Sequence, residues 1–331
     1  NKAAMLGDAK GQYLTAKALK NAIGTEKDLT KSFEWFELSA DQNLPEAKLE
    51  LAYAYREGLG VEKNATEAFK WFLASAEDGD RTAQNEVGKS LRDGSGTPRD
   101  AKGAFKWFEK SANLGDRDAM TNLALAYLDG QGVIRDIEAA ITWLENSSSR
   151  EEPRADYHLG KMYASGTHLE KNENEAFSLI RRAAQKGLMV AQRELGEFYK
   201  KGIGTDQNLI ESFKWIKKAA EQQDRRAYYL LSQAYFKGEG TKKNNELALS
   251  NAKKALALGL EEASFLIDVL SSSTNTKTEI IAQSENGLNF GSYHALIIGN
   301  DDYQNVSKLN TGEIDARAVN KILKAKFNFK T

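Results

Sequence analysis

Apolar and small residues recur along most of the chain at a step of 36 residues. An alanine opens each copy of the pattern, at Ala47, Ala83, Ala119, Ala155, Ala191, Ala227 and Ala263. The fourth residue after it is Leu51, Val87, Leu123, Leu159, Leu195 or Leu231, and the eighth is Tyr55, Leu91, Tyr127, Tyr163, Tyr199 or Tyr235. Because residues four apart share one face of an α-helix, this stripe predicts a helix in every copy.

Glycine marks the end of this first helix. The eleventh position is Gly58, Gly94, Gly130, Gly166, Gly202 or Gly238, where a chain can leave a helix in a left-handed conformation. A polar stretch follows, such as residues 61–66, which is typical of a loop and a helix N-cap. Ala68, Trp71, Phe72 and Ala76 then recur at helical spacing, so each copy is predicted to be a helical hairpin.

Tryptophan holds one position of the second helix, as Trp35, Trp71, Trp107, Trp143 and Trp215, with Leu179 and Asn251 in the other two copies. One interpretation is an aromatic ladder that binds a ligand; the other is packing between adjacent hairpins. Small residues in the first helix are expected to leave the gap that the tryptophan fills, at Ala52, Gly88, Ala124, Gly160, Gly196 and Ser232. We therefore favour packing, and expect replacement of a tryptophan by alanine to cost about 3 to 5 kcal/mol.

The two helical patterns together, A-x-x-x-L-G-x-x-Y-x-x-G-x-G and A-F-x-W-[FI]-x-x-A-A-x-x-G, resemble the Sel-one-like repeats, which are relatives of the tetratricopeptide repeats. The resemblance covers about Gly11 to Leu270 in about seven copies. It implies an all-α, right-handed superhelical solenoid over residues 1–270. Gly11 and Thr15 in the first copy, and His168 in the fifth, depart from the pattern, so we expect local differences in geometry there.

The resemblance also implies a surface for a protein or peptide partner, because first helices line the concave side of tetratricopeptide solenoids. The lining positions lie two, six, nine and ten residues after the opening alanine, and they vary between copies. In the early copies they include Leu49, Arg56, Glu57, Asn85, Lys89, Arg92, Asp93, Thr121 and Asp129. We predict docking on the later copies, at Tyr157, Lys161, Arg193, Glu197, Lys200, Lys201, Tyr229, Gln233, Phe236 and Lys237. Tyr157, Tyr229 and Phe236 are expected to be exposed; a solvated face without a partner is the alternative.

Composition narrows the possible chemistry. The 46 basic and 47 acidic residues among 331 leave a formal charge of −1, which disfavours direct binding of nucleic acid. Cysteine is absent, which excludes thiol nucleophiles, disulfides and thiolate metal sites within this chain. We expect no metal or other cofactor, because His158 and His168 have no third ligand at metal spacing. No apolar run approaches the about 20 residues of a membrane span, so no membrane partner is expected.

The periodic pattern ends at Leu270, and residues 271–292 are predicted to be a linker. A buried strand over residues 295–299 and an amphipathic helix over 313–323 then predict an α/β segment. The string H-A-L-I-I-G-N-D-D-Y from His294, with L-N-T-G-E-I-D-A-R-A-V from Leu309, resembles the start of a caspase-like (metacaspase-type) cysteine peptidase domain over residues 293–331. Any other α/β domain is the alternative. His294 precedes the strand, so no catalytic residue is carried over from that family.

These resemblances predict the recognition arm of a larger bacterial caspase-like cysteine endopeptidase. The partner is then another protein or peptide, or the chain's own C-terminal peptidase domain. A non-enzymatic adaptor that binds its partner through the concave repeat surface is the alternative. We expect a cytoplasmic location, or a periplasmic or secreted one if a leader was removed before Asn1.

Overall fold

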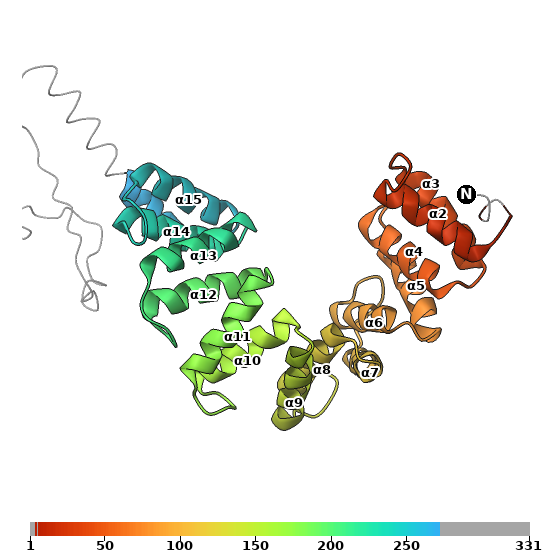
Figure 1. The fold of residues 1–331 in the computed structure, drawn as a ribbon, viewed down its shortest axis with the longest axis horizontal. Coiled ribbons are helices and arrows are strands. Elements are labelled where there is room, and N and C mark those ends of the chain that lie inside the picture. The colour runs from red at the N-terminus through yellow and green to blue at the C-terminus, as the bar shows by residue number, and fades with distance from the viewer. Residues whose placement is uncertain (1–3, 5, 272–331) are drawn as a thin grey trace, which may run out of the picture. The chain divides into compact units, whose positions relative to one another are not determined.

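The computed structural model describes residues 4 and 6–271, and in this part of the chain every regular element is a helix. The helices form seven antiparallel hairpins in chain order (Figure 1). The first helices are α2 (Ala9–Asn21), α4 (Pro45–Glu57), α6 (Arg81–Asp93), α8 (Arg117–Asp129), α10 (Pro153–Ser165), α12 (Met189–Lys201) and α14 (Arg225–Lys237). The second helices are α3 (Leu29–Asp41), α5 (Ala65–Glu77), α7 (Ala101–Asn113), α9 (Ile137–Ser149), α11 (Glu173–Gln185), α13 (Leu209–Glu221) and α15 (Asn245–Ala257). The predicted helical hairpin is therefore confirmed in this region.

Each hairpin uses the same capping chemistry at its turn. The first helices from α4 to α14 end on the glycine expected from the sequence, with φ between 68° and 77°. In every second helix the N-cap side-chain oxygen accepts a backbone N–H of the first turn, from Asp28, Asn64, Asp100, Asp136, Asn172, Asn208 or Asn244. Capping satisfies backbone groups that a helix end leaves unpaired, so each copy fixes its own helix boundaries.

The gap between the two helices of a hairpin is filled by the residue after the tryptophan. A Cβ atom added to Gly88 would lie 2.5 Å from Phe108, and one added to Gly196 would lie 2.4 Å from Ile216. Both of these large side chains are buried. The prediction that tryptophan fills this gap was wrong, because one residue along a helix turns the side chain by about 100° and directs it elsewhere.

The tryptophans instead pack between adjacent hairpins. Trp71 packs against the cluster around Phe36 and Leu51 and also against the cluster around Phe72 and Val87. Trp143 likewise joins the clusters of two successive hairpins. The tryptophan side chains are half-buried, and their position agrees with packing between hairpins.

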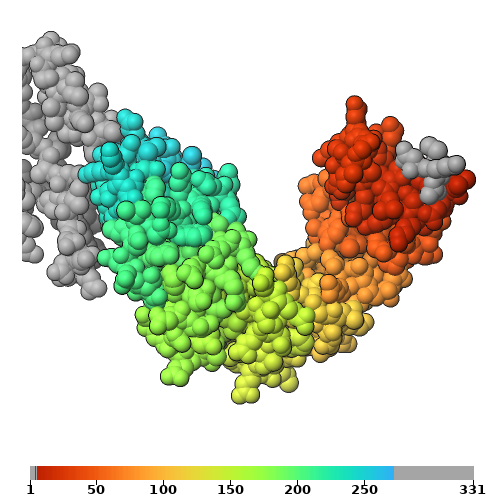
Figure 2. All heavy atoms as spheres, viewed as in Figure 1, coloured from red at the N-terminus to blue at the C-terminus, as the bar shows by residue number. Residues whose placement is uncertain are grey.

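A second glycine brings consecutive hairpins into backbone contact. A Cβ atom on Gly60 would lie 2.0 Å from the carbonyl oxygen of Leu29, the first residue of the preceding second helix. Gly96, Gly132, Gly204 and Gly240 make the equivalent approach. In the fifth copy His168 has the same left-handed backbone, with φ of 70°. The hairpins are in continuous contact from the first to the last (Figure 2).

Residues 263–271 form a further helical segment that covers the last hairpin, where Leu266 and Leu270 pack with Ala248. The predicted linker, apart from Ser271, and the predicted caspase-like segment at 293–331 lie outside the described residues. Among the described helices, none has the length and apolar character needed to span a membrane.

Candidate functional site

Consecutive first helices lie side by side and exchange polar contacts. Lys20 on α2 forms an ion pair with Glu50 on α4 at 2.6 Å. Arg56 on α4 forms one with Glu86 on α6 at 2.7 Å. In both pairs the basic residue lies nine positions after the opening residue of its copy, which is Gly11 or Ala47. The acidic residue lies three positions after the opening alanine of the next copy. We call the side of the stack that carries these contacts the first-helix surface.

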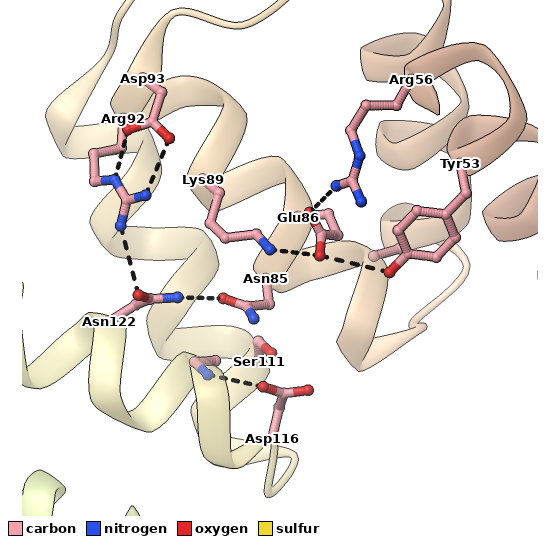
Figure 3. A network of polar contacts seen from close by, with 12 residues as sticks. Tyr53, Arg56, Asn85, Glu86, Lys89, Arg92, Asp93, Ser111, Asp116 and Asn122 are labelled. Carbon is pink, nitrogen blue, oxygen red and sulfur yellow. Dashed lines mark hydrogen bonds and ion pairs between the residues drawn. The ribbon is translucent and has the colours of Figure 1, made fainter. Parts of the chain in front are cut away.

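Glu86 is the centre of one group of contacts (Figure 3). Its Oε1 accepts from Lys89 at 2.6 Å and from the Tyr53 hydroxyl at 3.5 Å, while Oε2 accepts from Arg56. Burial, and then the Glu86 charge, raise the pKa of Tyr53, which therefore stays a neutral donor. The Arg56 guanidinium also lies 4.8 Å from the centre of the Tyr53 ring. The Glu86 carboxylate is thus fully used within the stack.

The corresponding position on α8 is Asn122, a neutral residue. Its Oδ1 accepts from Arg154 on α10 at 3.0 Å and, at 3.5 Å, from Arg92 on α6. Its Nδ2 donates to Asn85 at 2.8 Å, and Arg92 makes two further bonds to Asp93 (Figure 3). One buried amide therefore connects three successive first helices. A pocket of about 150 Å³ adjoins it, with Arg92 and Asp129 among its lining residues.

The residues predicted for docking do lie on first helices, but most of the charged ones are paired. Lys161 binds Glu194 at 2.6 Å, and Lys200 binds Glu239 at 2.6 Å. Arg193 pairs with Asp224, the N-cap residue of α14. Glu197 pairs with Lys201 at 3.1 Å, and Lys237 lies 3.9 Å from Glu239.

The aromatic residues predicted to be exposed are half-buried, and that prediction was wrong. Tyr229 and Phe236 pack against the cluster of Ala248, Leu266 and Leu270, because residues 263–271 cover this end of the stack. Tyr157 packs against the cluster around Leu195. Burial raises its pKa. Gln233 is also half-buried.

The sequence interpretation missed the third position after the opening alanine. It holds Glu50, Glu86, Asn122, His158, Glu194 and Leu230 in successive copies. The available signal was an acidic residue at this position 30 residues after a basic one, as in Lys20 with Glu50 and Arg56 with Glu86. That spacing connects copies rather than turns of one helix, so a search within single helices does not find it.

The described residues show no cluster of three or more His, Asp, Glu or Cys side chains able to hold a metal ion. Burial, and then the charge of Arg154, lower the pKa of His158 to about 4, so its imidazole is neutral near pH 7. In this part of the chain, basic and acidic side chains form ion pairs along the stack of first helices. It offers a surface for binding.

Successive helical hairpins with a common cap, a common core and a varied polar face define an α-solenoid repeat protein. The model of the Sel1 repeat matches residues 9–44, 45–80, 82–116, 117–150, 153–188, 190–224 and 225–260. The chain therefore belongs to the Sel1 repeat family.

Two solved structures are similar. One is c5321, a protective antigen present in uropathogenic Escherichia coli strains that displays an SLR fold, at 28% identity and a TM-score of 0.65. The match covers 81% of this chain and 58% of c5321, so this chain spans less than two thirds of that protein. The other is a Sel1 repeat protein from Oxalobacter formigenes, at 27% identity and a TM-score of 0.65, with 81% and 77% covered. No curated protein matches this chain.

Proposed function

We propose that the chain is a scaffold that binds a partner protein along its first-helix surface. The observation that supports this proposal is the contrast between constant and varied positions of one helix. The packing position four residues after each opening alanine stays aliphatic, whereas the exposed tenth position changes from Glu and Asp to Ser and Lys, at Glu57, Asp93, Asp129, Ser165, Lys201 and Lys237. Side chains free from packing duties can be matched to a partner, copy by copy.

Photocrosslinking tests this proposal. p-Benzoylphenylalanine replaces Lys161 on the first-helix surface or, as a control, Arg181 on the exposed side of α11. We expect a specific protein adduct from position 161 and none from position 181, with the adduct identified by mass spectrometry. The purified partner should then bind more weakly to Lys161→Glu than to Arg181→Glu. Equal adducts from both positions, or no adduct from position 161, would contradict the proposal.

A second candidate function is the recognition arm of a caspase-like cysteine endopeptidase. It is supported by the string from His294 to Tyr303 and the D-A element at Asp315 and Ala316. In that case the first-helix surface presents a substrate or activator to the peptidase, or binds the chain's own C-terminal domain.

The second candidate is tested with the natural protein, including any residues that follow Thr331. Cleavage of a co-purified protein, lost when a cysteine encoded there is replaced by alanine, would support the peptidase assignment. Absence of a downstream cysteine or of any cleavage would leave the scaffold function alone.

A further inference from the structure

In most ion pairs of the first-helix surface, the acidic side chain lies beneath the basic one. In the Arg56–Glu86 pair the side chains are 38% and 10% exposed, and in the Lys161–Glu194 pair they are 46% and 16% exposed. Lys20, Lys89, Arg193 and Lys200 are likewise more exposed than their acidic partners. An approaching partner therefore meets these basic groups, together with Glu57 and Asp93, whose side chains are 50% and 56% exposed.

At the centre of the stack, the third position after the opening alanine carries no carboxylate. Where the second, third and sixth copies have glutamate, the fourth has Asn122 and the fifth has His158. Two guanidinium groups thus converge on the neutral Oδ1 of Asn122.

Arg92 has a carboxylate partner in Asp93, whereas within the described part of the chain no carboxylate oxygen forms an ion pair within 4 Å of the Arg154 guanidinium. The acidic groups in this region are Asp129, which lines the adjoining pocket, and Glu152, which accepts the Arg154 backbone N–H at 3.3 Å; His158 is neutral near pH 7. The Arg154 guanidinium therefore has no paired carboxylate in the described part of the chain, unlike Arg56 at Glu86 and Lys161 at Glu194.

We propose that an acidic segment of the partner protein binds across α6, α8 and α10, with one Asp or Glu side chain of that segment bonded to Arg154 beside Asn122. The incoming carboxylate supplies Arg154 with the negative charge that glutamate supplies to basic side chains in the neighbouring copies. This inference rests on the proposed scaffold function and specifies its partner. An Arg–carboxylate pair is the strong, charge-assisted type of hydrogen bond, so it can anchor the segment. The side chains of Lys89 and Arg56, which are 33% and 38% exposed, lie farther along the same surface and can contact further acidic residues.

Fluorescence anisotropy of the full chain with a fluorescein-labelled decaglutamate peptide tests the inference. Arg154→Gln removes the anchor, and Asn122→Glu supplies the missing carboxylate from within, as the sequence does at Glu50, Glu86 and Glu194. Arg181→Gln on α11 is the control with the same loss of charge. A twenty-residue oligothymidylate is the comparison probe, and circular dichroism checks that every variant is folded.

We expect Arg154→Gln and Asn122→Glu each to weaken binding of decaglutamate about tenfold, as the loss of one charge-assisted hydrogen bond predicts. Arg181→Gln should change it by less than about twofold, because an exposed charge away from the site contributes little. Unchanged binding in the first two variants would overturn the inference, as would an equal loss in the control. Tighter binding of the oligothymidylate, lost in the same variants, would overturn the assignment to a protein.

The two proposals fail in different ways. If a partner crosslinks at position 161 but decaglutamate binding is unaffected by Arg154→Gln, the scaffold function stands and the proposal that the partner binds through an acidic segment is wrong. If decaglutamate binds at Arg154 but position 161 captures no partner, the anionic site stands and the scaffold function is wrong.

Discussion

At the scale of single residues, Phe108 and Trp107 are neighbours in α7 that have different surroundings. Phe108 is 2% exposed and lies against Gly88, whereas Trp107 is half-buried and carries Lys110 over its ring at 4.2 Å. We expect Phe108→Ala to lower the free energy of unfolding by about 3 to 5 kcal/mol, because it opens a cavity in the core. Trp107→Ala should cost less, since part of its ring is already in water.

Urea unfolding followed by circular dichroism measures both costs. Trp107→Ala emerging as the more destabilising variant would contradict the assignment of Phe108 as the core residue of the hairpin.

Glu152 gives a prediction for pH. Its side chain is 4% exposed, and burial, followed by a hydrogen bond with Asp118, raises its pKa to about 7 from 4.5. The folded protein therefore keeps a proton that the unfolded chain releases near pH 4.5. The contribution of Glu152 to stability is fully present below that pH and is lost as pH rises through about 7.

Glu152→Gln should remove this slope, so its stability relative to the parent chain should rise between pH 5 and pH 8. Thermal unfolding of both proteins across that range measures the difference. His158 has the opposite slope, since its lowered pKa favours folding above about 6.5, but it is present in both proteins and cancels. A difference that does not vary with pH would show that Glu152 is already ionised in the fold.

At the scale of elements, the loop after each first helix carries a testable strain. His168 has φ of 70° at a position where the six other copies have glycine. A left-handed backbone costs a residue with a Cβ atom roughly 1 kcal/mol, so His168→Gly should raise the free energy of unfolding by about that amount. Gly96→Ala is the reverse case and should be destabilising, because its Cβ atom would lie 2.0 Å from the carbonyl oxygen of Ala65.

Urea unfolding of the two variants against the parent chain checks both signs. If His168→Gly instead lowers the free energy of unfolding, the imidazole makes a stabilising contribution that outweighs the cost of the left-handed backbone.

Most of these elements could be predicted from the sequence, because the signals are local. The glycine at the end of a first helix and the Asn or Asp cap of a second helix act within a few residues, and both were found. The partner of Gly88 was assigned to the wrong residue, because the choice between Trp107 and Phe108 depends on where the opposite helix lies. Spacing along one helix does not contain that information.

At the scale of the whole molecule, the repeated contacts predict that one complete copy can be removed. Deletion of residues 117–152 joins Asp116, the cap of α8, directly to Pro153, the first residue of α10. We expect a folded chain whose urea m-value falls by about one seventh, because hairpins contact mainly their neighbours. Binding of decaglutamate should weaken, because the deletion removes Asn122 and places Arg154 beside α6, which carries Glu86.

Circular dichroism and urea unfolding measure the result. Deletion of residues 117–134, which removes one helix and its loop, is the control and should not give a folded stack. Equal behaviour of the two deletions would contradict a stack built from independent hairpins.

The candidate binding surface was predicted only in part. The sequence pattern correctly placed Lys161, Arg193 and Lys200 on first helices, but it predicted that Tyr229 and Phe236 are exposed. Their burial depends on residues 263–271, which lie outside the last complete copy. The ion pairs were missed because they join side chains about 30 residues apart, and their geometry follows from the stacking of whole hairpins.

The close approach of Gly60 to the carbonyl oxygen of Leu29 has a consequence for how such a gene can change in length. One extra codon in this loop would move the glycine off the carbonyl and shift the cap residue of the following helix, which would disturb two hairpins at once. An added or lost segment of 36 codons leaves every such approach in register. The stack can therefore grow or shrink only in whole copies, and the reach of its surface changes in discrete steps.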